Sequence, residues 1–421
     1  MGASVPAAAI VAIGDELLLG DTIDTNSAWL GRRLADLGVP VCRGWTIPDA
    51  KADIAAAVVR AAALAEVVLV TGGLGPTPDD RTREALADLT GAALRVDRDL
   101  LAGLEDRFRS RGYELLPERN VSQAQVLEGA RILPNSLGTA PGQAVEVEGS
   151  LVILLPGVPG ELVRLVEEQV VPLLSQRFAG RLRPLHHRRI HTTGVPESVL
   201  AEMVESALPQ DMGPVALAYL PGLGGVELRL TARGVDNAEA ARWLDSIEEA
   251  LEPAVREYRY YSDRRDLADA LGSALVAASR TLAVAESCTG GLIAKRLTDL
   301  PGASKYFVGG LVAYDDRIKT DVLGVSREDI EAHGVVSEDV AAAMARGVAQ
   351  TMGADAGLGV TGIAGPGGGS DQKPVGTVCF AAYFDGRCEV RRERFKGDRT
   401  GIRERAAQAT MALLLRMLEA G

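Results

Sequence analysis

The sequence has few aromatic residues, few basic residues relative to acidic ones, and no long apolar run. Tryptophan, tyrosine and phenylalanine together make up only 4% of the 421 residues, which leaves few rings for stacking on single-stranded nucleic acid. The 45 basic residues are outnumbered by 57 acidic ones, giving a net charge of −12. An acidic chain repels a polyphosphate backbone. Both observations argue against a general nucleic-acid-binding protein.

Cysteine and histidine are also scarce, with four residues of each. The cysteines form no CxxC pair and the histidines show no metal-ligand spacing, which is typical of a reducing compartment rather than of a disulfide framework. No apolar run approaches the roughly 18–20 residues of a membrane-spanning helix. The N-terminal residues lack the basic segment and cleavage site of a signal peptide. The sequence therefore predicts a cytoplasmic protein without a membrane anchor.

Glycine, by contrast, is abundant, with 47 residues, many of which follow apolar segments. Strand-like and helix-like segments alternate over residues 1–175 and again over 262–421, which predicts a parallel α/β sheet in each region. Residues 176–258 instead predict a small α+β module. In parallel α/β sheets, ligands bind beyond the carboxyl ends of the strands. The glycine-containing loops at those ends are therefore the candidate sites.

In the first region, three loops follow apolar strands: Gly14-Asp15-Glu16, Thr71–Asp80 and Pro156–Glu161, the last after a predicted strand Val147–Leu155. We expect these loops to meet in one cleft. Their glycines suit a phosphate, and the adjacent carboxylates of Asp79 and Asp80 suit Mg²⁺ or another hard divalent ion. The alternative is that the two aspartates cap a helix beginning at Arg81.

In the last region, Ser287 lies on a predicted turn between an apolar strand and a helix, Gly290–Leu297. Such a turn exposes a hydroxyl and directs backbone N–H groups toward it, as a nucleophile and an oxyanion hole require. Local sequence alone favours a helix cap by Ser287 or Thr289 over a nucleophile. For a base it offers both His333 and Lys319, the latter following Tyr314. It does not choose between them.

The glycine-rich segment Val360–Gly369 follows another apolar run. Its glycines allow backbone N–H groups to approach a phosphate or an oxyanion, although a flexible surface loop is equally consistent with them. Lys373, Arg399 and Arg403 are cations suited to pair with a phosphate. Together these features suggest serine-type hydrolysis of a small phosphorylated substrate.

Five segments of the last region, in the same order, resemble the C-terminal domain of the CinA (competence/damage-inducible protein A) family. They are Glu286–Gly291, Ala313–Lys319, His333–Glu338, Val360–Gly369 and Lys373–Val378. The resemblance implies a nicotinamide mononucleotide (NMN) amidohydrolase that needs no cofactor. It implies Ser287 as nucleophile, Lys319 as base and Tyr314 as an assisting residue, and so favours the nucleophile over the cap. The substrate-binding residues that it implies are Thr289, Gly290, Thr361, Gly362, Ala364, Gly365, Arg399 and Arg403.

The first region resembles the molybdopterin-binding fold in its CinA version, a three-layer α/β domain. The matching segments are Gly14-Asp15-Glu16, Thr71–Asp80, Asn135–Gly142 and Pro156–Glu161. The resemblance implies an ADP-ribose pyrophosphatase that requires a divalent metal (Mg, Mn or Co). It implies Gly72, Gly73 and Gly75 for the diphosphate, and Glu16, Asp79, Asp80 and Glu161 for the metal.

The middle region is similar to the linking module of the same family at Thr193-Gly194 and Ala218–Pro221. The resemblance therefore spans essentially the whole chain, and it implies a homodimer. Two other functions remain open at this stage: a non-catalytic partner in DNA uptake or recombination, and a molybdopterin-binding protein. The acidic charge and the scarcity of aromatic residues count against the first.

Overall fold

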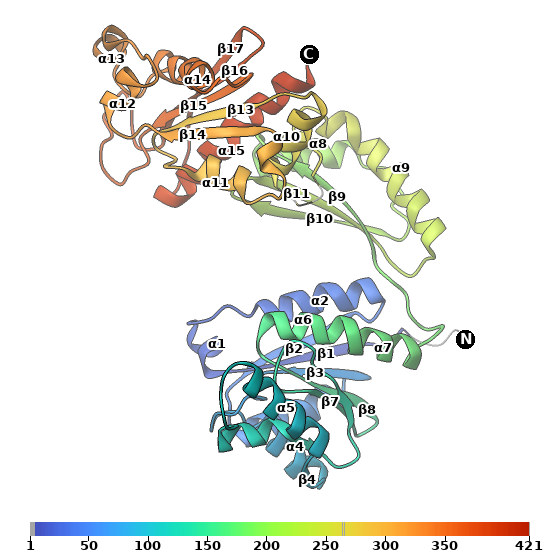
Figure 1. Cartoon of the computed structure of the whole chain (residues 1–421). Coiled ribbons are helices and arrows are strands. Elements are labelled where there is room, and N and C mark those ends of the chain that lie inside the picture. Colours follow the sequence, from blue (N-terminus) through green and yellow to red (C-terminus); the bar gives the residue numbers. More distant parts are fainter. Residues whose placement is uncertain (1–4, 263, 265, 421) are drawn as a thin grey trace. The chain divides into compact units, whose positions relative to one another are not determined.

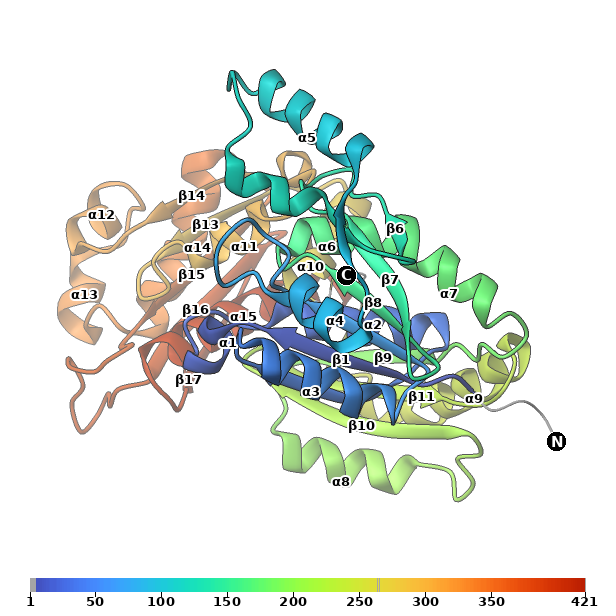
Figure 2. The same ribbon diagram turned by 90° about the horizontal axis from the view of Figure 1, so that it is seen from below.

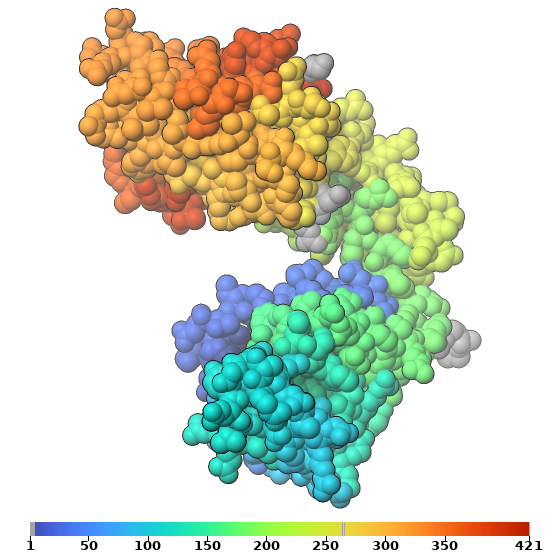
Figure 3. Space-filling model, in the orientation of Figure 1, coloured from blue at the N-terminus to red at the C-terminus, as the bar shows by residue number. Residues whose placement is uncertain are grey.

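The computed structural model describes residues 5–262, 264 and 266–420, and their contacts divide the chain into two units (Figure 1). The first unit contains the chain up to His186 together with Ala232–Ala241, and the second contains His187–Thr231 and the chain from Arg242 onward. Figure 3 draws them as space-filling surfaces, the first from blue to green and the second from green to red.

The first unit is built on a six-stranded sheet with the strand order β2-β1-β3-β8-β7-β6. Its strands are β1 (Ala8–Ile13), β2 (Val41–Ile47), β3 (Val67–Thr71), β6 (Arg131–Leu133), β7 (Gly142–Val147) and β8 (Ser150–Leu155). The first four strands in that order run parallel to one another. Strand β7 runs antiparallel to both of its neighbours, β8 and β6. The predicted single strand Val147–Leu155 is wrong, because Glu148 and Gly149 adopt positive φ and turn the chain between β7 and β8.

Helices cover both faces of this sheet, which confirms the three-layer α/β fold. On one face lie α2 (Thr25–Leu37), α6 (Pro159–Leu165) and α7 (Val171–Arg177), the last two joined by a π-helical segment, Val166–Val170 (Figure 1). On the other lie α3 (Lys51–Ala62) and α4 (Thr82–Thr90) (Figure 2). Strands β1, β3 and β8 are buried along their whole length, as their unbroken apolar runs require between two helical layers.

The remaining elements of this unit lie outside the main sheet. They are α1 (Asp15–Leu19), β4 (Leu94–Val96), α5 (Arg98–Ser110), the 3₁₀ helix Glu118–Ala124 and β5 (Gln125–Leu127), and β4 pairs with β5.

The second unit contains most of the small α+β module. Its four-stranded sheet has the order β10-β11-β9-β12. The elements are β9 (His186–Thr192), α8 (Glu197–Ala207), β10 (Val215–Gly222), β11 (Gly225–Ala232), α9 (Asn237–Val255) and β12 (Arg259–Tyr260). Along β11, Val226, Leu228 and Leu230 are buried while Glu227 and Arg229 between them are partly exposed, which is the alternation of a strand with one covered face.

The C-terminal domain of the second unit is a five-stranded sheet with the order β14-β13-β15-β16-β17, in which only β16 and β17 are antiparallel to their neighbours. The strands are β13 (Leu282–Glu286), β14 (Phe307–Val312), β15 (Ala356–Gly362), β16 (Thr377–Phe384) and β17 (Arg387–Arg394). The helices are α10 (Leu267–Ala277), α11 (Leu292–Thr298), α12 (Asp316–Asp321), α13 (Arg327–His333), α14 (Glu338–Met352) and α15 (Arg399–Glu419), and a 3₁₀ turn covers Ala303–Lys305.

Helices α10, α11 and α15 cover one face of this sheet, and α14 covers the other. Helix α14 packs closely on β15, because a Cβ atom on Gly357 or Gly359 would overlap the α14 backbone at Ala345 or Ala341.

In both units, the predicted loops follow adjacent parallel strands. They come after β1, β3 and β8 in the first unit and after β13, β14 and β15 in the second. Each set of loops therefore leaves its sheet at the same edge. That the loops of the first unit meet in one cleft stays a prediction. None of the helices in the described part of the chain is long and apolar enough to cross a lipid bilayer.

Candidate functional site

Ser287 lies at the carboxyl end of the central strand β13. Its backbone N–H donates to the Val360 carbonyl of β15 (2.9 Å), which fixes the residue at the sheet edge. The chain then turns through Gly290 and Gly291, whose φ angles of 61° and 90° favour glycine. The Ser287 side chain is partly exposed and has no hydrogen bond to the described residues. Its hydroxyl is thus available to a ligand.

The cap of α11 comes from Glu286 rather than from Ser287 or Thr289. The Glu286 carboxylate is only 1% exposed and accepts hydrogen bonds from the N–H groups of Ile293 (3.1 Å) and Ala294 (2.8 Å). A carboxylate is favourable at this end of a helix, because the first N–H groups lack partners and carry partial positive charge. Helix α11 therefore begins at Leu292, two residues later than predicted.

Tyr314 and Lys319 follow the neighbouring strand β14. The Ala313 N–H donates to the Glu286 carbonyl (2.7 Å), so this segment leaves the sheet beside the Ser287 turn. The Lys319 side chain is 2% exposed, and its Nζ donates to Asp316 Oδ1 at 2.9 Å and to the Tyr314 carbonyl at 3.5 Å. No hydrogen bond joins Lys319 to Ser287 in the described structure. The alternative base, His333, ends α13 with a side chain that is 53% exposed.

Two arginines of α15 connect the predicted segments. Arg403 donates from Nη2 (2.6 Å) and Nε (3.2 Å) to the Thr289 carbonyl. Arg399 donates to the Gly365 carbonyl (2.7 Å) and to the Tyr314 hydroxyl (3.1 Å). The structure therefore brings together the Ser287 turn, Tyr314 and the glycine-rich loop, which sequence reasoning had identified separately.

The other predicted residues near this loop have internal roles or are buried. Thr361 donates to the Val335 carbonyl (2.8 Å), and Lys373 donates to the carbonyls of His333 (2.6 Å) and Val336 (2.7 Å). Gly362 follows Thr361 at the end of β15, and Ala364 is 5% exposed. The buried hydroxyl of Thr289 has no hydrogen-bond partner among the described residues, so it is a free polar group inside the turn.

Cys288 is the only thiol next to the proposed nucleophile. Its side chain is 5% exposed, and burial raises its pKa to about 12. The thiol is therefore protonated at neutral pH, and a protonated thiol is a poor nucleophile. Of the two neighbouring side chains, that of Ser287 is the more exposed.

In the first unit, Asp80 fixes the glycine-rich loop after β3. Its carboxylate accepts from the N–H groups of Gly75 (2.7 Å) and Thr77 (2.8 Å). It does not cap the following helix, which begins at Thr82 with no side-chain cap. The Thr82 hydroxyl in turn donates to the Gly72 carbonyl (2.8 Å). The backbone that was predicted to bind a diphosphate is thus held in place by its own side chains.

A buried arginine lies against the same loop. Arg83 is 2% exposed and donates to the carbonyls of Leu74 (2.8 Å) and Gly75 (3.0 Å). Burial lowers its pKa to about 10, and it forms no ion pair within the described residues. Asp80 and Glu84 act on its charge from a longer distance, so Arg83 places a buried cation against a loop that Asp80 also holds. The sequence offered no signal for this residue beyond its position at the start of α4.

Two of the four predicted metal ligands, Glu161 and Asp80, accept hydrogen bonds from the chain, and the other two, Glu16 and Asp79, lie near a further carboxylate. Glu161 accepts from the Asn135 amide (2.9 Å), and Asp80 is occupied by its loop. Glu16 and Asp79 instead lie near Asp49, whose pKa is raised by burial and by the charges of Asp15, Glu16 and Asp79. Sequence reasoning missed Asp49, whose carboxylate accepts from the Asp15 N–H (3.0 Å).

No set of three or more histidine, cysteine, aspartate or glutamate side chains in the described chain is arranged to hold a metal ion by itself. The donors near Asp49 are hard oxygen atoms whose negative charges are not neutralised, which suits a divalent cation that also takes ligands from a substrate. Mg²⁺ commonly binds in this way, through one or two carboxylates and phosphate oxygens.

Three family models match consecutive parts of the chain. They are described as "Probable molybdopterin binding domain" (residues 9–176), "Damage-inducible protein CinA KH domain" (187–260) and "CinA C-terminal domain" (264–418). A CinA-like protein of Gemmatimonas aurantiaca is 44% identical over 408 residues, covering 97% of this chain and 95% of the relative. A CinA-like protein of Dictyoglomus thermophilum is 41% identical over 394 residues, covering 94% and 95%.

Among solved structures, the protein CinA of Thermoplasma acidophilum is similar, with 35% sequence identity and a TM-score of 0.37. The match covers 40% of this chain and 99% of that one.

Replacing Glu286 tests the assignment of the α11 cap. We expect Glu286→Ala to increase hydrogen exchange in a peptide spanning 286–298 by about 30-fold, because losing a buried charged acceptor costs about 2 kcal/mol. Glu286→Gln keeps one acceptor oxygen and should give a smaller increase. Exchange is measured by mass spectrometry, with Glu331→Ala on the exposed face of α13 as the control. Unchanged exchange in Glu286→Ala would contradict the cap.

Proposed function

Because the chain belongs to the CinA family, we propose that it is a hydrolase whose C-terminal domain releases ammonia from NMN. The observation that carries this proposal is the free Ser287 hydroxyl on a glycine turn that Arg403 and Glu286 immobilise, with the buried Lys319 on the segment that follows the neighbouring strand β14. The proposal includes a cytoplasmic location, since the four cysteines are all unpaired.

In the proposed reaction, Ser287 Oγ attacks the carbonyl carbon of the nicotinamide amide and gives its proton to Lys319 Nζ. The C–N bond then breaks, and the amide nitrogen leaves as ammonia with the proton from Lys319. Water hydrolyses the resulting ester to nicotinate mononucleotide and restores Ser287. The Cys288 and Thr289 N–H groups donate to no backbone carbonyl in the described turn, and both lie within hydrogen-bond reach of the Cys288 sulfur. They are the proposed oxyanion donors.

Arg399 and Arg403 are the proposed contacts for the substrate phosphate. Both lie in the first turns of α15, a 21-residue helix, where the helix dipole also favours an anion. Guanidinium groups suit phosphate because their N–H groups form paired, charge-assisted hydrogen bonds. Nicotinamide lacks this phosphate, so the site should reject it.

The test is ammonia release from NMN by the full chain in the presence of EDTA. Ser287→Ala and Lys319→Met are expected to lower kcat by about 10³-fold or more, as for other nucleophile–base pairs. Cys288→Ala is the matched control and should stay within about threefold of wild type, since its protonated thiol takes no part. Full activity in Ser287→Ala, or loss of activity in EDTA, would overturn the proposed mechanism.

For the first unit we propose metal-dependent hydrolysis of ADP-ribose to AMP and ribose 5-phosphate. It is supported by the loop Gly72–Gly75 with Arg83 against it, and by the carboxylates of Glu16, Asp49 and Asp79. When bound, a divalent cation neutralises diphosphate charge and polarises the P–O bonds. The loop N–H groups and Arg83 would orient the diphosphate, while Glu16 and Asp79 would hold the ion.

AMP release from ADP-ribose should therefore require Mg²⁺ or Mn²⁺ and stop in EDTA. We expect Asp79→Asn to lower this activity by about tenfold or more, because it removes a metal ligand. Asp88→Asn, which changes an exposed partner of Lys51, is the control. Deamidase activity measured on the same samples should not change. Metal-independent AMP release would refute this half of the proposal.

We further propose that a second copy of the chain pairs along β14. The two edges of the C-terminal sheet differ, because six of the eight residues of β17 are charged whereas β14 has none. Val308 (49% exposed) and Val312 (50% exposed) project from β14. Charged residues protect a sheet edge from pairing, and an uncharged edge invites it. Two identical strands related by a two-fold axis satisfy each other's backbone groups.

Light scattering after size-exclusion chromatography checks this pairing. Wild type should elute as a dimer, and Val308→Lys/Val312→Lys as a monomer, since the lysines of the two copies would face each other across the axis. Arg394→Glu on β17 is the control and should remain dimeric. A dimeric double lysine variant would exclude β14 as the interface.

A further inference from the structure

The second unit contains a cavity of about 680 Å³ between its α+β module and its C-terminal domain. One wall is formed by residues 193–197 and by the turn between β10 and β11, and the other by β16, β17 and α15. This volume is typical of small-molecule sites. None of the residues around Ser287 lines the cavity. Arg403 contacts the Ser287 turn, whereas Arg405, two residues further along α15, lines the cavity.

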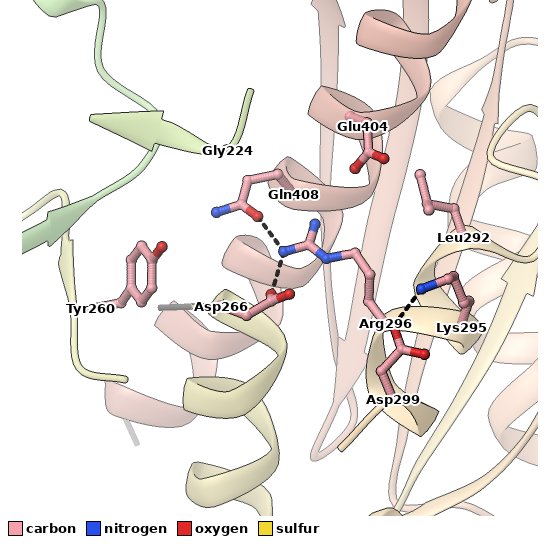
Figure 4. A pocket seen from close by; sticks show the side chains of 9 residues that line it. All are labelled: Gly224, Tyr260, Asp266, Leu292, Lys295, Arg296, Asp299, Glu404 and Gln408. Carbon is pink, nitrogen blue, oxygen red and sulfur yellow. Dashed lines mark hydrogen bonds and ion pairs between the residues drawn. The ribbon is translucent and has the colours of Figure 1, made fainter. Parts of the chain in front are cut away.

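The walls of the cavity are tied together by Gln408 of α15. This side chain is 4% exposed, and its Nε2 donates to Thr193 Oγ1 (3.3 Å) of the α+β module. Its Oε1 accepts from Arg296 Nη2 (2.8 Å), and Arg296 also pairs with Asp266. Figure 4 shows Gln408 between Arg296 and the strand end at Gly224. The hydrogen bond between Gln408 and Thr193 thus joins the two walls of the cavity, which both belong to the second unit.

Positive charge predominates along the cavity. Four cations (Arg391, Lys396, Arg405 and Arg416) and two carboxylates (Glu197 and Glu393) line it. Lys396 and Arg416 form no ion pair with any described carboxylate. A local excess of two positive charges in a chain of net charge −12 selects for an anion. Surface lysines and arginines left unpaired are the usual partners of phosphate groups.

The cavity also has an apolar surface suited to a flat ring. Phe395 is partly exposed and stacks on the buried Phe380 with a centroid distance of 6.5 Å and an interplanar angle of 27°. Pro221 and Leu413 also line the cavity. Aromatic and aliphatic walls with a few polar groups are typical of ligand sites. Charge and ring surface together match a ligand that carries both a phosphate and a base.

We propose that this cavity is a second, non-catalytic binding site for a nucleoside monophosphate. Lys396 and Arg416 supply charge for the phosphate, Phe395 supplies a surface for the base, and Glu197 and Glu393 offer acceptors for ribose hydroxyls. The inference does not depend on the proposed deamidase or pyrophosphatase activity, because none of its residues belongs to either site.

Photolabelling of the full chain with 8-azido-AMP, followed by peptide mapping, tests the site. We expect label in peptides containing residues 193–197, 221–226 or 391–396, with competition by unlabelled AMP. Lys396→Glu/Arg416→Glu should reduce this labelling at least tenfold, because each reversal replaces an attraction to phosphate by a repulsion. Peptide mapping separates this label from any label in residues 5–186.

Lys295→Glu is the matched control, since Lys295 is an exposed cation of α11 that lies outside the cavity. Both cavity substitutions are at exposed positions, and circular dichroism confirms that the variants are folded. Absence of label from the three peptides, equal labelling of the charge-reversed variant, or equal labelling by 8-azidoadenosine without its phosphate would each overturn the proposal.

Discussion

The buried carboxylate of Glu286 is the interaction on which the C-terminal site depends. It accepts the first free N–H groups of α11, so neither Ser287 nor Thr289 has to cap this helix. The position of one acidic side chain therefore separates the structural task of ending the turn from the chemical task of exposing a hydroxyl.

In the first unit, one negative and one positive side chain hold the glycine-rich loop in place through hydrogen bonds to its backbone. Asp80 accepts from the loop N–H groups, and Arg83 donates to the loop carbonyls. A glycine-rich segment loses much conformational entropy when it becomes ordered. Charged hydrogen bonds within the chain offset part of that cost before a ligand arrives, so binding energy need not be used to order the loop.

Much of this arrangement follows from sequence pattern. Apolar strands alternating with helices predict parallel sheets, and parallel sheets place their loops at one edge, so the glycine-containing loops could be identified as candidate sites. Only the structure shows that Arg399 and Arg403 connect the Ser287 turn, Tyr314 and the glycine loop. Residues whose role depends on contacts between different elements could not be predicted from local sequence. Asp49 and Arg83 acquire their roles only from neighbours on other elements. The turn at Glu148-Gly149 was missed although Gly149 and Ser150 are turn-forming residues, because Glu148 is a non-glycine residue and such residues rarely adopt positive φ.

Helix α15 contacts both the loops around Ser287 and the α+β module of the second unit. Twelve of its residues are buried, as expected for a helix surrounded by protein rather than one with a solvent face. Arg399 and Arg403 bind the loops of the Ser287 site, while Gln408 contacts Thr193 in the α+β module. A shift of α15 would change both sets of hydrogen bonds, since a packed interior transmits displacement instead of absorbing it. The α+β module is thus connected through α15 and the buried Gln408 to the residues that would hold the substrate phosphate.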